Sequence, residues 1–65
     1  MMNMNILEKI IDDKLIYMRT EELEELLKVV LEKNVSAYLS MNIIDELKDR
    51  DLERYNEFKK EFLEG

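Results

Sequence analysis

Residues 20–34, with the sequence TEELEELLKVVLEKN, carry the clearest helical pattern in the chain. Thr20 is a favourable N-cap residue, and the glutamates that follow it lie where the helix dipole is positive. Apolar residues then recur at intervals of three and four on one face, namely Leu23, Leu26, Leu27, Val30 and Leu31. Asn34 tolerates the left-handed conformation that ends many helices. Together these signals predict an amphipathic helix over residues 21–33.

The preceding segment has the same periodicity and predicts a first helix over residues 5–18. Its apolar face contains Ile6, Leu7, Ile10, Ile11, Leu15, Tyr17 and Met18. Lys14 interrupts this face, so either its charged end reaches water from a regular helix or the helix loosens there. We expect a joint between the two helices at residues 19–20, although a helix continuous through Arg19 is the alternative.

The segment after Asn34 has too many apolar residues for one helical face, so we expect it to be buried on several sides or to bend. Its candidate N-caps are Ser36, Ser40 and Asn42, and Asn42 with Asp45 resembles a capping box. The pattern predicts a helix over residues 36–63, with a possible break near residues 49–51. The two helices on either side of Asn34 and Val35 would then form an antiparallel hairpin, with the first helix packed across it.

One apolar stripe in this last segment repeats the helical spacing after eleven residues. It consists of Ile44, Leu47, Asp51, Tyr55, Phe58 and Phe62. An unpaired carboxylate in an apolar stripe would be costly, so Asp51 requires an explanation. It could cap a fourth helix, pair with an arginine in a continuous stripe, or fix the register against a partner.

The same stripe contains the candidate interface residues, because aromatic side chains are common anchors of protein interfaces. An aromatic stripe at helical spacing can equally be the core of the monomer. The candidate interface with a partner or a second copy consists of Leu47, Asp51, Tyr55, Phe58 and Phe62.

The composition argues against catalysis. The 65 residues include no Cys, His, Trp or Pro, and the single Gly is the last residue. A disulfide framework, an ordinary zinc site and a catalytic triad each need residues that are missing here. The chain also lacks the internal glycines of calcium loops and phosphate-binding loops. We therefore expect no enzymatic activity, no catalytic residue, no cofactor and no metal.

The charge pattern bears on the partner. With 16 acidic and 10 basic residues, the net charge is −6. Because the basic residues are interleaved with acids, no basic stripe is present, and we do not expect direct nucleic-acid binding. We expect neither a signal peptide nor a membrane span, and the absence of cysteine favours a cytoplasmic location.

These observations predict a single all-α domain over residues 1–65, a small bundle of three to four helices. A domain of this size buries only about 60% of its unfolded surface, so we expect homodimerisation to complete it. The expected function is non-enzymatic binding to another protein, as a regulator or inhibitor of the bacterial or phage modulator type. The alternative is a structural subunit that acts in assembly. A weaker alternative is a mimic of nucleic acid or a nucleic-acid-associated protein.

Overall fold

The computed structural model describes residues 4–64, and this part of the chain is helical without strands. The elements are α1 (Met4–Lys14), the 3₁₀ turn η1 (Leu15–Tyr17), α2 (Thr20–Glu32), α3 (Ala37–Arg50), α4 (Leu52–Lys59) and the π-helical turn η2 (Lys60–Glu64). The predicted all-α class is confirmed.

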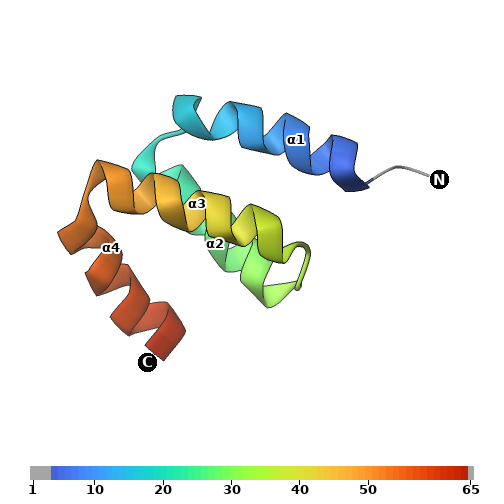
Figure 1. Ribbon diagram of the computed structural model, residues 1–65. Coiled ribbons are helices and arrows are strands. Elements are labelled where there is room, and N and C mark those ends of the chain that lie inside the picture. Colours follow the sequence, from blue (N-terminus) through green and yellow to red (C-terminus); the bar gives the residue numbers. More distant parts are fainter. Residues whose placement is uncertain (1–3, 65) are drawn as a thin grey trace.

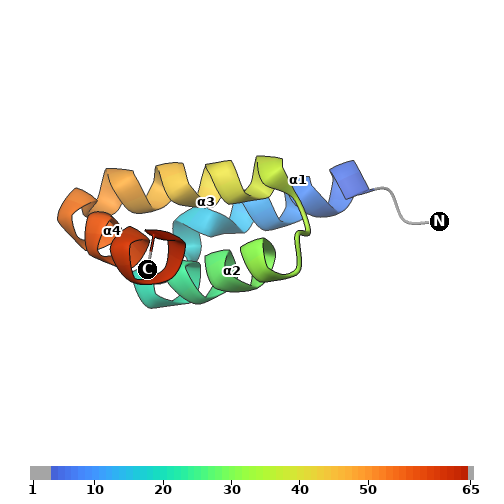
Figure 2. The ribbon, with the colours of Figure 1, turned by 90° about the horizontal axis from the view of Figure 1, so that it is seen from below.

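The helices form a flat arrangement that measures 38 × 24 × 15 Å. Helices α2 and α3 form the expected antiparallel hairpin, with α1 and α4 on opposite sides of it (Figures 1 and 2). Helix α1 contacts α3 rather than lying equally across both helices. The two outer helices therefore each cover a different side of the central pair.

The hairpin turn is determined by local chemistry at Asn34 and Ser36. Asn34 adopts the left-handed conformation, with φ 51°, as expected for a residue that ends a helix. The amide of Val35 donates to the carbonyl of Val30 at 3.1 Å, and that of Asn34 to Leu31 at 3.3 Å, which is the Schellman pattern. Ser36 then caps α3 by accepting a hydrogen bond from the amide of Leu39 at 3.1 Å.

Ser36 rather than Ser40 or Asn42 is thus the N-cap of α3. The predicted capping box at Asn42 and Asp45 is wrong, because the helix has already begun at Ala37 and both residues lie within it. Ser40 is buried one turn into α3, where its hydroxyl donates to the carbonyl of Ser36 at 2.9 Å.

The break in the predicted 36–63 helix occurs at Asp51. Its backbone is extended, and its carboxylate accepts a hydrogen bond from the amide of Arg54 at 3.0 Å. Asp51 is therefore the cap of a fourth helix, and a continuous stripe through it is wrong. Because capping keeps the carboxylate at the exposed turn, it avoids the cost of a buried charge.

The predicted first helix, 5–18, ends earlier than expected. Regular α-helix stops at Lys14, a 3₁₀ turn follows, and Met18 and Arg19 are extended. The continuous alternative is thus wrong, and the loosening near Lys14 is observed. Tyr17, expected on the apolar face, is 82% exposed, because the tighter 3₁₀ turn rotates it away from the core.

The predicted N-cap of the second helix also differs by one residue. Arg19, not Thr20, is the N-cap, and Thr20 is the first helical residue. The amide of Arg19 donates to the Glu22 carboxylate at 2.8 Å, so the glutamate three residues on stabilises this end of the helix.

A single cluster of buried side chains joins the central hairpin to η1 and α4. It consists of Leu15, Leu23, Leu27, Val30, Leu39, Ile43, Leu47, Tyr55 and Phe58. Ile11, Met18, Leu26 and Ile44 pack against it as partly buried side chains. Leu31, expected on the buried face of α2, instead stays exposed at the edge of that face.

Candidate functional site

The surface retains large apolar side chains on several elements. Exposed side chains include Ile6, Ile10, Ile16, Tyr17, Val29, Leu31, Val35, Tyr38, Met41, Leu52, Phe62 and Leu63. Isolated apolar residues at the surface are normal, so the informative ones are those that gather in a concave region. Leu31, Phe62 and Leu63 do so.

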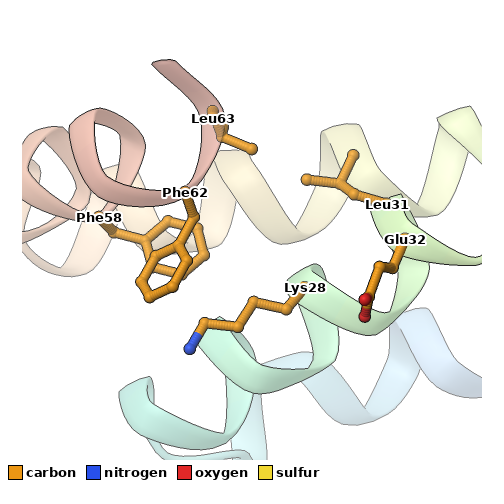
Figure 3. Close-up of a pocket in the computed structure, with 6 residues that line it drawn as sticks. All are labelled: Lys28, Leu31, Glu32, Phe58, Phe62 and Leu63. Atoms are coloured by element: carbon orange, nitrogen blue, oxygen red, sulfur yellow. The ribbon is translucent and has the colours of Figure 1, made fainter. Parts of the chain in front are cut away.

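These three residues line a groove between α2 and the C-terminal end of α4 with η2, which we call the α2–α4 groove. It has a volume of about 490 Å³ and is lined by Lys28, Leu31, Glu32, Phe58, Phe62 and Leu63 (Figure 3). The apolar lining remains accessible to solvent, since Phe62 is 50% exposed and Leu31 and Leu63 are each 40% exposed.

Phe58 anchors the groove to the core. Phe58 is buried, while Phe62, one turn later, stands at the surface with its ring centroid 5.0 Å from that of Phe58. The Lys28 ammonium lies over the Phe62 ring, 3.8 Å from its centroid, so a cation–π contact connects α2 to η2. The two rings and the lysine stem are visible together in Figure 3. The cation–π contact therefore crosses the groove from α2 to η2.

Two cations at the rim already have acidic partners. Arg54 donates to both carboxylate oxygens of Glu24, at 3.0 and 3.1 Å, and lies 3.9 Å from Glu21. The hydrogen bond and the negative charge of Glu24 raise the pKa of the Arg54 guanidinium above its ordinary value. Lys28 pairs with Glu25 at 3.1 Å.

A smaller hollow of about 180 Å³ continues the groove toward the N-terminal ends of α2 and α4. Its lining adds Glu24, Arg54, Glu57 and Glu61 to Lys28, Phe58 and Phe62. Among the residues that the structure describes, Glu32, Glu57 and Glu61 form no ion pair. The groove thus combines an apolar floor with uncompensated negative charge.

A second groove lies between α1 and α3, and it is polar. It has a volume of about 570 Å³ and is lined by Glu8, Lys9, Asp12, Asp13 and Tyr38. The Ser36 hydroxyl donates a hydrogen bond to the Glu8 carboxylate, which attaches α1 to the start of α3. The Glu8 carboxylate of this second groove therefore already contributes to the fold.

The predicted interface residues separate into two groups. Leu47, Tyr55 and Phe58 are buried within this chain, which corresponds to the core alternative for the aromatic stripe. Asp51 caps α4, and Phe62 lines the α2–α4 groove. Only Phe58 and Phe62 among the five lie in the groove, and the structure does not bring Leu47 or Asp51 to it.

Sequence reasoning predicted Phe58 and Phe62 but missed Leu63 and the groove residues that α2 contributes. Lys28 and Glu32 lie on α2, where neighbouring residues give no signal for a long-range contact, and Leu31 was predicted on the apolar face. The available signal was the position of Leu31 at the edge of the α2 apolar face, beyond the arc that α3 covers.

No family model, curated protein or solved structure matches this chain. Within residues 4–64, none of the helices combines the length and the apolar character required to cross a membrane. The described side chains contain no cluster of three or more His, Cys, Asp or Glu that could hold a metal ion.

Proposed function

We propose that this chain is a non-enzymatic protein that acts by binding another protein, as a regulator or inhibitor of a larger one. The observation that carries this proposal is the α2–α4 groove, where Leu31, Phe62 and Leu63 stay 40–50% exposed beside a buried Phe58. Small folded chains gain stability by burying such side chains, and an apolar concave surface with a charged rim is typical of a docking site.

A small modulator of the bacterial or phage type fits the size of the chain. Its contact surface would consist of side chains supported by secondary structure, because Phe62 packs at a tilt against Phe58 and contacts Lys28 on its ring face. A preorganised anchor loses little side-chain entropy on binding, which favours affinity from a small area.

A structural subunit that acts in assembly is the second candidate. It is favoured by exposed apolar residues at the opposite edge, where Ile6 and Ile10 lie one turn apart on α1 and are at least half exposed. A second copy of the chain on this face would complete the bundle as a homodimer.

The test is affinity capture of the tagged chain from nuclease-treated lysate of its host, followed by quantitative mass spectrometry. Phe62→Ser is the groove variant, and Ile16→Ser is the matched control, because Ile16 is also exposed but lies in η1. One stoichiometric protein that the wild type and Ile16→Ser recover and Phe62→Ser loses would support the regulator. Recovery of the bait alone, as a defined oligomer by sedimentation, would favour the structural subunit.

A further inference from the structure

We infer that the occupant of the α2–α4 groove is an amphipathic helix of the partner protein, with an apolar stripe flanked by Lys or Arg. This inference rests on the proposed function and specifies the chemistry of its partner. Three features of the groove lead to it: its shape, the exposure of its apolar lining and the charges left at its rim.

The shape fits a helix. Helix α2 and the segment formed by α4 and η2 run in the same direction along the groove. Glu24 contacts Arg54 at one end, and Lys28 contacts Phe62 further along both. The α2 side of the α2–α4 groove, from Glu24 to Glu32, is about 12 Å long at about 1.5 Å per residue, or roughly two helical turns. An amphipathic helix that binds such a groove places apolar residues at positions i, i+3, i+4 and i+7 along it.

The exposure of the lining distinguishes a helix from a small molecule. Pockets for small molecules enclose most of the ligand surface. Here Phe62, Leu31 and Leu63 are 40–50% exposed before anything binds, so the groove is open along its length. A few apolar side chains presented by a helix can cover these residues while the helix backbone stays outside.

The charges determine which helix fits. Lys28 contacts Glu25 and the Phe62 ring, and Arg54 pairs with Glu24. In the part of the chain that the structure describes, Glu32, Glu57 and Glu61 have no cationic partner. Glu32 belongs to α2, and Glu57 and Glu61 lie one turn apart on the opposite wall. Basic residues on both flanks of the bound helix would therefore meet free carboxylates.

The same charges argue against the other occupants. A second copy of this chain carries a net charge of −6 and would bring like charges to an acidic rim. Nucleic acid and anionic lipid surfaces would be repelled for the same reason. A basic amphipathic helix is the occupant that satisfies both the apolar floor and the rim.

The direct test uses three fluorescein-labelled 18-residue peptides. One has Leu at the a and d positions and Lys on both flanks, the second has Glu on the flanks, and the third replaces Leu by Ser but keeps Lys. We expect the Leu/Lys peptide to bind about tenfold or more tightly than either other peptide, with weaker binding at high salt. Amide chemical shifts of Leu31, Phe62 and Leu63 should move most.

Matched triple variants separate the groove from the overall charge. Glu32→Gln, Glu57→Gln and Glu61→Gln together should weaken binding of the Leu/Lys peptide about tenfold, since three exposed charge pairs with the peptide would be lost. The control triple is Asp12→Asn, Asp13→Asn and Asp45→Asn, which changes the net charge equally outside the groove. It should bind like the wild type. Equal losses in both triples, or shifts centred on Tyr38, would overturn the inference.

The same triples keep this inference separable from the proposed function. A partner protein captured by the wild type and the control triple but lost by the groove triple supports both. A partner captured equally by all three leaves the regulator standing and overturns the basic-helix groove. Capture of the bait alone, with a doubled mass by sedimentation, contradicts both.

Discussion

Arg50 offers the sharpest test of how the fold is held together. Its guanidinium donates to the carbonyls of Met18 at 2.6 Å and Leu15 at 2.9 Å, and reaches that of Ile16 at 3.4 Å. These carbonyls belong to η1 and to the connection to α2, where the regular α-helical hydrogen bonding of α1 has stopped. Arg50, the last residue of α3, therefore supplies hydrogen-bond donors to backbone carbonyls of η1 and of the connection that follows it.

Replacing Arg50 by Gln should destabilise the chain by about 2–4 kcal/mol. Hydrogen bonds from a charged donor contribute about 1.5–3 kcal/mol each, and the two shorter bonds would be lost. The side chain is 21% exposed, so water would replace part of this loss, while the Glu46 carboxylate would lose its ion pair at 3.0 Å. For a domain of this size the melting temperature should fall by about 10–25 °C.

Thermal and urea unfolding followed by far-ultraviolet circular dichroism measure this loss. The matched control is Arg54→Gln, which removes the same charge from the pair with Glu24 and should have the smaller effect, because the Arg54 side chain is 43% exposed. Arg50→Lys should lie between wild type and Arg50→Gln, because one ammonium nitrogen cannot reproduce the two-pronged contact. If Arg50→Gln and Arg54→Gln have the same melting temperature, the assigned role of Arg50 is wrong.

Substitutions at four further positions test the caps, the core and the groove. Asp51→Ala should cost about 1 kcal/mol in urea unfolding because α4 loses its N-cap, whereas Asp51→Asn should retain most of the stability. Asn34→Ala should cost about 1 kcal/mol because the residue is left-handed, and Asn34→Gly should be no less stable than wild type in the same assay. Phe58→Ala should cost about 3–5 kcal/mol and unfold most of the chain at 25 °C by circular dichroism. Phe62→Ala, at the exposed end of the same pair, should keep the helical signal, and equal losses for the two phenylalanines would contradict the distinction between core and groove.

The helices and most of their ends were predictable because the signals are local. Asn34 ends α2 and Ser36 begins α3 through bonds within five residues along the chain, so their chemistry can be recognised without knowing the fold. Asp51 was more ambiguous, because a capping carboxylate and one in a continuous stripe have the same helical spacing.

The selection of core residues required tertiary structure. Helical periodicity identifies an apolar face but not the arc that a neighbouring helix covers, so Leu27 and Leu31 looked equivalent. Packing against α3 buries Leu27 completely, while Leu31 remains at the rim of a groove. Likewise, the α-to-3₁₀ change after Lys14 places Tyr17 in water.

Long-range polar contacts were beyond prediction for a related reason. The contacts of Arg50 with Leu15 and Met18 span 35 and 32 residues, and no periodicity relates their positions. The pairing of Glu24 with Arg54 and the cation–π contact of Lys28 with Phe62 arise in the same way, once α4 runs alongside α2. Local hydrogen bonding and hydrophobic spacing are encoded in neighbouring residues, so the sequence specified the helices. The groove arises from surfaces that meet only when those helices pack, so its floor and its free carboxylates emerged with the tertiary structure.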